Sequence, residues 1–294
     1  MTMENHALIF GASGTQGWAI VNELLHSYPT LETFSRVTAL THRPLPDNNL
    51  SGINLLENNV EQDLEEKVRA IGTVTHVFFT AYIHHEDPQQ EISINVRTLR
   101  NAITAVEKLS NNLKSVVLAT GVEAYGVHLM KDFPYRDRLP LSEDLPRIPK
   151  PWCSQLFYYF QTDFLAERSR GKAWTYCELR PDTIIGFVPN KNAFCLPQTL
   201  ARFLALYREM NGEGAECPFP GSEGASRCMA NDSGQDSIAR FAIHAALHPQ
   251  VCGGGQAFNI VSHSVPASWV EKWPKVCEFF GIMGTPPIPE GVPN

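Results

Sequence analysis

Short apolar runs alternate with helical patterns along the first two thirds of the chain. We expect strands at the apolar runs 7–10, 37–40, 53–56, 74–79, 115–120 and 174–179. Apolar residues spaced three and four positions apart predict helices that include 18–26, 92–109 and 157–168. Strands that alternate with helices in this way usually form a parallel sheet. The pattern therefore predicts an α/β fold, a Rossmann-type doubly wound parallel sheet whose ligands bind at the carboxyl ends of the strands.

The pattern changes from residue 189 onward, where further helices are expected at 197–210, 236–247 and 269–280. We predict a dinucleotide-binding Rossmann region at 1–188 and a small, mostly helical region at 189–294 that mainly caps the substrate. The two regions are expected to form a single compact unit, and residues 257–261 are a candidate for one more strand of the sheet. The stretch 131–152 is rich in proline and charge and is predicted to be a long loop beside the site.

A glycine motif, Gly-x-x-Gly-x-x-Gly at residues 11–17, follows the first predicted strand and precedes a helical pattern. The first glycine permits a sharp turn, the second lets backbone N–H groups approach a pyrophosphate, and the third lets the helix pack against the strand. The N-terminus of that helix then faces the phosphates. The motif predicts dinucleotide binding, and the alternative is a glycine-rich turn without a ligand. The cofactor-binding residues expected here are Gly11, Ser13, Gly14, Thr15, Gln16 and Gly17.

Two basic residues, His42 and Arg43, follow the second predicted strand. NAD-binding chains commonly carry an acidic residue here for the ribose hydroxyls, whereas an arginine accommodates the 2′-phosphate of NADP. The planar guanidinium of Arg43 suits a phosphate, and His42 is placed to assist it. We therefore predict NADP(H) rather than NAD as the cofactor, with an exposed basic turn as the alternative. Asp63 is a candidate contact for the adenine amino group, or else a solvated loop residue.

Composition narrows the class of protein. The chain has 294 residues, of which 43% are hydrophobic and 19% charged, and its net charge is −7. These values are typical of a globular protein, and the negative charge argues against a nucleic-acid surface. The seven cysteines are dispersed, which suits a reducing compartment, and no apolar run is long enough to span a bilayer. We expect a cytoplasmic protein with a small-molecule substrate and with no nucleic-acid or membrane partner.

The ten histidines show no metal-ligand spacing. The cluster at 84–87, His-His-Glu-Asp, is interpreted as a solvated polar turn, so no metal site is predicted.

The predicted helix at 157–168 resembles a known family. Tyr159, Asp163 and Glu167 have the spacing of the Tyr-x-x-x-Lys-x-x-x-Glu motif of extended short-chain dehydrogenases/reductases, with aspartate in place of lysine. Residues 156–163 look like the Asn-Phe-Tyr-Tyr-x-x-Glu-Asp motif of the progesterone 5β-reductase/iridoid synthase-like group. By the register of further motifs, the resemblance runs from about residue 6 to about residue 282.

The resemblance implies that the chain reduces the C=C bond of an enone or enal with NADPH. Residues 180–187 are similar to the group's Arg-Pro-x-x-Ile-x-Gly-Phe strand end, whose backbone borders the nicotinamide. The cofactor-binding residues expected at strand ends are Thr80, Ala81, Thr120, Arg180, Pro181 and Ile184.

The chain departs from the group's Thr-Gly-x-Lys-x-Tyr motif, because residues 120–125 read Thr-Gly-Val-Glu-Ala-Tyr. Glu123 takes the lysine position, and Gly121 takes the position of the wider family's catalytic serine. A lysine cation favours tyrosinate, whereas a carboxylate disfavours a second negative charge. A tyrosine beside Glu123 should remain a neutral phenol, which is a poor base but a competent hydrogen-bond donor to an enolate oxygen. The substitution therefore weakens the alcohol dehydrogenase reading more than the ene-reductase reading.

Tyr158 and Tyr159 are both candidates for the catalytic phenol. Consecutive helix residues point about 100° apart, so only one of them can face the nicotinamide. The helix spacing favours Tyr159, although the sequence does not separate the two, and the other tyrosine is expected to pack in the core. An apolar substrate pocket is expected from Tyr125, Trp152, Phe157, Phe187 and Phe219.

The sequence therefore predicts an NADPH-dependent reductase of an α,β-unsaturated carbonyl in a small apolar metabolite. Two alternatives stay open: a non-redox isomerase or cyclase on the same scaffold, and an NADP-binding sensor without turnover. A homodimer is also left open, and the identity of the substrate is not predicted.

Overall fold

The computed structural model describes residues 5–26, 28–30, 32–41, 53–57, 64–189 and 195–289. His42, Arg43 and Asp63 lie outside these residues, so their expected contacts with the cofactor stay predictions. Among the described residues, none of the helices combines the length and the apolar character that crossing a bilayer requires.

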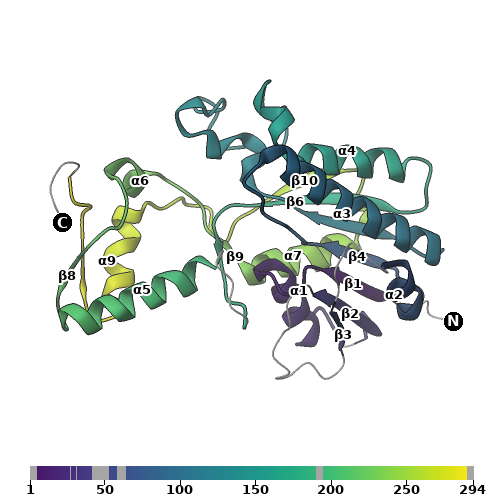
Figure 1. The fold of residues 1–294 in the computed structure, drawn as a ribbon, viewed down its shortest axis with the longest axis horizontal. Coiled ribbons are helices and arrows are strands. Elements are labelled where there is room, and N and C mark those ends of the chain that lie inside the picture. The colour runs from purple at the N-terminus through teal and green to yellow at the C-terminus, as the bar shows by residue number, and fades with distance from the viewer. Residues whose placement is uncertain are drawn as a thin grey trace.

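Within the described residues, a seven-stranded sheet forms the centre of the fold, in the order β3-β2-β1-β4-β5-β6-β10 (Figure 1). Its strands are β1 (His6–Phe10), β2 (Arg36–Thr41), β3 (Ile53–Glu57), β4 (His76–Phe79), β5 (Ser115–Ala119), β6 (Thr175–Pro181) and β10 (Gln256–Ile260). Every adjacent pair in this sheet is parallel. The strand order reverses between β1 and β4, which is the switch point where doubly wound sheets bind ligands. The predicted fold class and strands are confirmed, including the candidate strand near residue 257.

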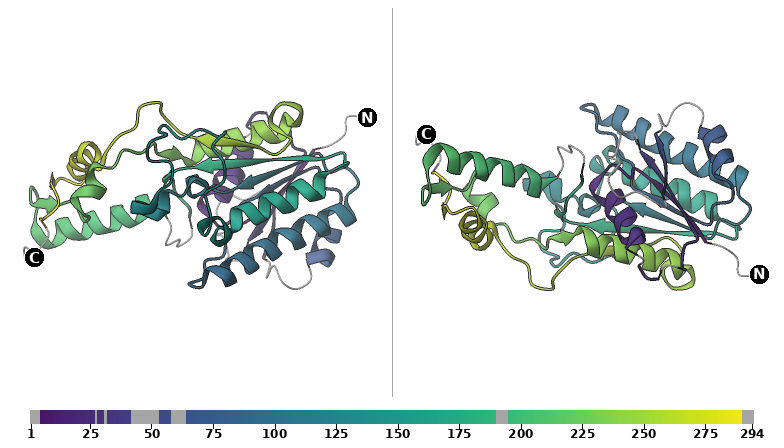
Figure 2. Two further views of the ribbon diagram at one scale, coloured as in Figure 1. Left: turned by 90° about the horizontal axis from the view of Figure 1, so that it is seen from above. Right: turned by 90° about the horizontal axis from the view of Figure 1, so that it is seen from below.

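Helices cover both faces of this sheet (Figure 2). On one face, α1 (Thr15–Leu25) packs beside α7 (Gln235–Leu247). The other face is covered by α2 (Leu64–Ile71), α3 (Pro88–Leu109) and α4 (Phe157–Ser169). The sheet is therefore the middle of three layers.

Alternating side chains of β1 enter two different cores. Ala7 and Ile9 pack in the core under α1 and α7, whereas Leu8 and Phe10 pack in the core under α3. Burial of each large apolar side chain stabilises the fold by about 1.5–3 kcal/mol relative to exposure. Because both faces are covered, these strands are continuously apolar rather than alternating apolar with polar.

A long irregular connection links β5 to α4, as expected around residues 131–152. Its helical turns are η1 (Val122–Tyr125), η2 (Val127–Asp132) and η3 (Trp152–Gln155). The connection has its own small core, which contains Tyr125, Tyr135, Ile148, Leu156 and Tyr159. It leaves the carboxyl end of β5 and therefore lies at the edge of the sheet where a cofactor would bind.

The elements of the outer lobe are α5 (Leu196–Asn211), β8 (Glu216–Pro218), α6 (Glu223–Arg227), α9 (Trp269–Phe279) and β11 (Met283–Thr285). β8 and β11 pair in parallel, and a separate hydrophobic core forms around Leu204, Cys217 and Trp273. Figure 1 shows the lobe to the left, beyond the carboxyl ends of the sheet strands.

The chain passes between the sheet and the outer lobe through a short parallel pair, β7 (Ile184–Ile185) and β9 (Ser233–Gly234). Close to this pair, Lys272 of α9 forms an ion pair with Asp232 at 3.0 Å. These contacts tie the lobe to the rest of the molecule.

The structure divides the chain differently from the predicted boundary between 188 and 189. α7, α8 (Pro249–Cys252) and β10 belong to the sheet layers, so only part of 189–294 forms the lobe. The lobe also stands apart from the sheet in every view, rather than merging with it in one compact unit (Figures 1 and 2). Helical periodicity identifies α7 as a helix but does not say which surface it packs against, and contact with α1 decides that.

Candidate functional site

The glycine motif forms a tight turn between β1 and α1. Gly11 has φ +84°, in the left-handed region, and the Gly14 N–H donates to the Gly11 carbonyl at 2.9 Å. A Cβ built on Gly17 would lie only 2.3 Å from that carbonyl oxygen, so α1 can begin this close to β1 only with glycine there. The helix begins at Thr15, and its unpaired N–H groups face the carboxyl edge of the sheet.

The turn fits a dinucleotide pyrophosphate. A side chain at Gly11 would clash with Ala81 and one at Gly17 would clash with Gly11, so glycine is what lets the turn stay this tight, and Ser13 within it is buried. The side-chain oxygen of Gln16 is buried and has no hydrogen-bond partner among the described residues. A buried acceptor of this kind is commonly satisfied by a ligand or water.

Thr80 and Ala81, at the end of β4, border the glycine turn. The Thr80 hydroxyl donates to the Phe10 carbonyl at 2.8 Å, and a Cβ on Gly11 would lie 2.7 Å from the Ala81 nitrogen. These two residues therefore lie directly beside the glycine turn.

A buried polar network joins Thr120, Glu178, Arg180 and Tyr125 at the ends of β5 and β6. Thr120 donates to Glu178 at 2.7 Å, and Arg180 forms an ion pair with Glu178 at 2.8 Å. Arg180 also donates to the Tyr125 hydroxyl at 3.1 Å, and that hydroxyl donates to Asn259 at 2.7 Å. The Thr120 hydroxyl and two guanidinium nitrogens of Arg180 are thus engaged by the protein, whereas the buried Arg180 Nε has no hydrogen-bond partner among the described residues.

Tyr125 does not line an open pocket. It is 0% exposed, and burial raises the pKa of its phenol. The expectation that it contacts substrate is therefore corrected, because its ring and hydroxyl are enclosed by Arg180 and Asn259.

Tyr159 is fully occupied by the loop that packs on α4. Its hydroxyl donates to the Ala124 carbonyl at 2.5 Å and accepts from the Ile148 N–H at 3.0 Å. Arg147 lies over its ring and forms an ion pair with Asp163 at 2.6 Å. A phenol held by two backbone groups is not placed to donate to a substrate, so the preference for Tyr159 from helix spacing is corrected.

Tyr158 points in a different direction from the same helix. A Cβ built on Gly121 would lie 3.5 Å from the Tyr158 hydroxyl, and that hydroxyl has no hydrogen-bond partner among the described residues. Burial and then the Glu123 carboxylate raise its pKa well above the ordinary value, so the phenol is neutral at physiological pH. The phenol therefore lies beside the strand-end position where the wider family carries serine.

An aromatic stack adjoins Tyr158. Phe157 packs edge-on against Tyr158, with ring centroids 4.6 Å apart, and Tyr82 stacks on the other side of Phe157 at 5.6 Å. Trp152 is half-buried in the loop core, and Phe187 is 54% exposed. Phe157 is itself buried, so it supports the neighbouring rings more than it offers open surface.

Phe219 is not part of this site. It packs against Trp269 and Trp273 in the core of the outer lobe, with ring centroids 5.8 and 5.5 Å away. Its expected role in the pocket is therefore corrected, because its position in the sequence gave no information about which core it joins.

Glu123 is exposed on η1, and its charge acts on both Tyr158 and Tyr82.

Pro181 and Ile184 lie at the end of β6 and just beyond it. The Pro181 carbonyl lies 3.5 Å from the Cβ position of Gly121, and Ile184 pairs with Ser233. The structure thus gathers the glycine turn, the ends of β4, β5 and β6, Glu123 and Tyr158 at one edge of the sheet.

Sequence reasoning missed Tyr82, Glu91 and Arg147. Tyr82 stands two residues after Thr80 at a strand end, which is a signal that could have drawn attention to it. Arg147 lies in an irregular loop, and nothing in its neighbours indicates that it reaches Asp163.

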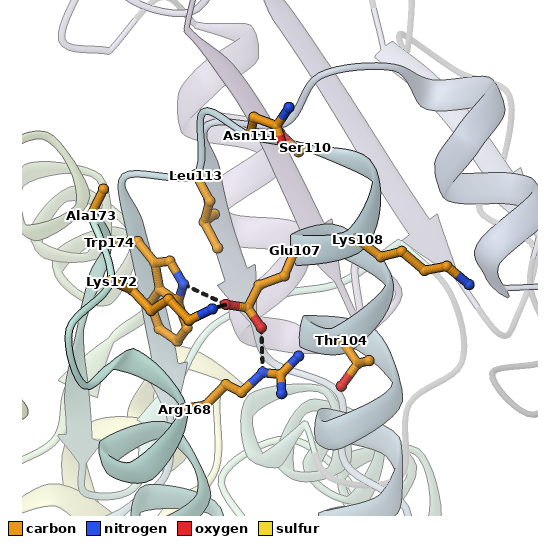
Figure 3. Close-up of a pocket in the computed structure, with 10 residues that line it drawn as sticks. All are labelled: Thr104, Glu107, Lys108, Ser110, Asn111, Leu113, Arg168, Lys172, Ala173 and Trp174. Carbon is orange, nitrogen blue, oxygen red and sulfur yellow. Dashed lines mark hydrogen bonds and ion pairs between the residues drawn. The ribbon is translucent and has the colours of Figure 1, made fainter.

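A cavity of about 460 Å³ lies elsewhere, and its lining residues are Thr104, Glu107, Lys108, Ser110, Asn111, Leu113, Arg168, Lys172, Ala173 and Trp174 (Figure 3). It adjoins the starts of β5 and β6, at the edge of the sheet opposite the glycine turn. Its one carboxylate, Glu107, is engaged by Arg168, Lys172 and Trp174. The cavity is not the site of the cofactor chemistry, and no cluster of potential metal ligands occurs among the described residues.

Comparisons with known proteins give the family and the fold of the chain. A family model described as a PRISE-like Rossmann-fold domain matches residues 7–294. A short chain dehydrogenase of Aspergillus calidoustus is 38% identical over 94% of this chain and 71% of its own length. An (S)-8-oxocitronellyl enol synthase of Nepeta racemosa is 32% identical over 95% of this chain and 70% of its own length. The Thermus thermophilus UDP-glucose 4-epimerase in complex with NAD shares the fold, with a TM-score of 0.67, 17% identity, and coverage of 98% of this chain and 88% of that chain.

Proposed function

Because the chain belongs to the PRISE-like Rossmann-fold family and is an oxidoreductase of the short-chain dehydrogenase/reductase type, we propose that it reduces an α,β-unsaturated carbonyl compound with NADPH. The substrate proposed is a small, mostly apolar enone or enal. The observation that carries the proposal is the neutral phenol of Tyr158, whose hydroxyl lies beside Gly121 and has no hydrogen-bond partner among the described residues.

The glycine turn would hold the pyrophosphate of the cofactor, and the nicotinamide would supply the hydride for the β-carbon. Reduction at that carbon leaves negative charge on the carbonyl oxygen of the substrate. Tyr158 donates a hydrogen bond to that oxygen and stabilises the enolate. One preorganised donor of this kind contributes about 3 kcal/mol to a transition state.

Glu123 supports this assignment through its charge. A carboxylate near a phenol disfavours tyrosinate, so Tyr158 acts as a donor and not as a base. Oxidation of an alcohol needs a base at this position, whereas reduction of an enone needs a donor. Proposed specificity for NADPH over NADH rests on Arg43, whose guanidinium suits the 2′-phosphate.

The test is the absorbance of reduced nicotinamide with a panel of apolar enones and enals, for NADPH and NADH in parallel. Wild type is expected to oxidise NADPH with at least one of these compounds. Tyr158→Phe should lower kcat/KM by about 100-fold, in line with the loss of one donor. Tyr207→Phe is the control, because Tyr207 donates its hydroxyl to the Glu216 carbonyl within the outer lobe.

Unchanged turnover in Tyr158→Phe would remove that residue from the mechanism. Tight binding of NADPH with no turnover of any compound would favour a sensor of the nucleotide.

A non-redox isomerase or cyclase is the second candidate, favoured by Glu123 in place of lysine and Gly121 in place of serine. A donor that polarises a carbonyl can promote rearrangement without a hydride. Conversion of a substrate with no loss of NADPH absorbance would support this candidate over the reductase.

A further inference from the structure

Tyr82 lies at the carboxyl edge of the sheet, directly after the residues that border the glycine turn. Its segment is fixed by Asn95 of α3, which is 1% exposed. The Asn95 side chain accepts from the Ile83 N–H at 2.9 Å and donates to the Ile83 carbonyl at 2.8 Å. This pair of bonds holds the loop as a strand partner would, so the place of Tyr82 is set by a buried side chain.

The Tyr82 hydroxyl belongs to a cluster of three titratable groups. It donates to Glu91 Oε1 at 2.6 Å and lies 3.2 Å from His84 Nδ1. His84 Nδ1 also lies 3.1 Å from the same carboxylate oxygen. The His84 side chain is 57% exposed, that of Glu91 is 19% exposed, and Tyr82 is 47% exposed, so the cluster is open to solvent at His84 and at the phenol.

The cluster adjoins the proposed donor through one ring. Phe157 is stacked nearly parallel to Tyr82, at 13°, and meets Tyr158 edge-on, at 72°. Tyr82 and Glu91 are among the groups whose charges act on Tyr158. Two phenols therefore flank Phe157 at the cofactor edge, one without a described hydrogen-bond partner and one connected to a chain of proton-carrying groups.

We propose that Tyr82 is a second catalytic residue, which protonates the α-carbon of the enolate that Tyr158 stabilises. This inference rests on the proposed reduction. The electron pair of the enolate forms the new C–H bond, and the O–H bond of Tyr82 breaks to leave tyrosinate. His84 gives its Nδ1 proton to the tyrosinate while its Nε2 takes a proton from solvent, and Glu91 holds both groups in place. Enone, NADPH and one solvent proton thus give the saturated carbonyl compound and NADP+.

Protonation by Tyr82 also determines the configuration of the product at its α-carbon. An enolate released from the site is protonated by water on either face, whereas an enolate protonated by one fixed phenol gains its hydrogen on one face. The chain is therefore expected to give a saturated carbonyl compound with a single configuration at the α-carbon.

The first test uses an enone that carries a methyl group on its α-carbon, reduced with NADPH in D2O. Wild type should give one configuration at that carbon, with deuterium incorporated. Tyr82→Phe, which keeps the ring that stacks on Phe157, should give an equal mixture of the two configurations, because water then protonates the enolate on either face. Tyr207→Phe should behave as wild type. An equal mixture from wild type, or one configuration from Tyr82→Phe, would overturn the proposal.

The second test does not need hydride transfer. By microscopic reversibility, the group that protonates the α-carbon also removes that proton. With NADP+ present, wild type should exchange the α-protons of butanone or cyclohexanone with D2O, followed by NMR, and Tyr82→Phe should exchange them about 100-fold more slowly.

Equal exchange by wild type and Tyr82→Phe would refute the role of Tyr82, whatever the redox activity. Exchange that depends on Tyr82, together with no NADPH oxidation by any enone, would instead refute the proposed reduction and leave the role of Tyr82 in place.

Discussion

At the scale of single residues, two adjacent tyrosines on one helix have different surroundings. Tyr159 holds the loop between β5 and α4, because its hydroxyl bridges the Ala124 carbonyl and the Ile148 N–H. Tyr158 has no such partner and faces the strand ends. The helix turns about 100° between them, and that rotation separates a structural phenol from a candidate donor.

We predict that the two Tyr→Phe changes differ in their effect on the free energy of unfolding. Tyr159→Phe leaves a buried N–H and a carbonyl without a partner, so it should lower the free energy of unfolding by about 1–3 kcal/mol. Tyr158→Phe breaks no described hydrogen bond and should change it by less than about 0.5 kcal/mol. Urea unfolding of both variants measures the difference.

Asp163→Asn is the matched comparison for the Tyr159 side of the helix. The ion pair with Arg147 is exposed, because the Asp163 side chain is 60% and the Arg147 side chain 48% accessible. Its loss should therefore lower the free energy of unfolding by less than about 1 kcal/mol. A larger loss in Asp163→Asn than in Tyr159→Phe would contradict the view that the backbone bridge holds the loop.

At the scale of elements, β4 combines a central position in the sheet with a titratable side chain. His76 is 2% exposed, packs edge-on against Phe34, and shares a hydrogen bond of 2.8 Å with Thr75. Burial and then the charge of Lys114 lower its pKa from 6.5 to about 4. The folded protein therefore holds a neutral imidazole in its core.

We predict that this residue makes stability depend on pH between about 6.5 and 4. In that window the unfolded chain binds a proton that the folded chain does not, so the free energy of unfolding falls as pH falls. The interval between the two pKa values corresponds to an upper bound of about 3 kcal/mol. Urea unfolding at pH 7, 5.5 and 4.5 should show the loss, and His76→Phe should show a smaller slope. An equal slope in both proteins would mean that other groups cause it.

Apolar runs and helical periodicity predict where the elements lie, but they do not predict how distant elements pack together. All the sheet strands were predicted within a few residues, because short apolar runs that alternate with helical patterns are typical of a parallel sheet covered by helices. The loop around 131–152 was predicted as irregular, yet its docking on Tyr159 was not, because the contacts depend on side chains from distant parts of the chain.

At the scale of the whole molecule, the Rossmann part and the outer lobe differ in how much of each helix is buried. α7 buries six residues, including Ile238 and Ile243, against the sheet and α1. α5 buries only Leu204, while Phe203, Leu206 and Met210 stay exposed. Local stability follows buried apolar contact, so the outer lobe should open before the Rossmann part.

Hydrogen–deuterium exchange tests this directly. Backbone amides of α5 and α9 are expected to exchange faster than those of α7 at the same pH and temperature. Equal protection in α5 and α7 would show that the outer lobe is as stable as the sheet and its helices.

The sequence alone determined the parallel sheet, the glycine turn and the family resemblance, because these depend on local pattern: periodicity, a strand that ends in glycine, and a motif within one helix. The tertiary structure decided which tyrosine faces the site, which core receives Phe219 and Tyr125, and which surface α7 covers. Those outcomes depend on the direction of side chains and on packing partners far away in the chain, and neighbouring residues in a sequence do not encode them.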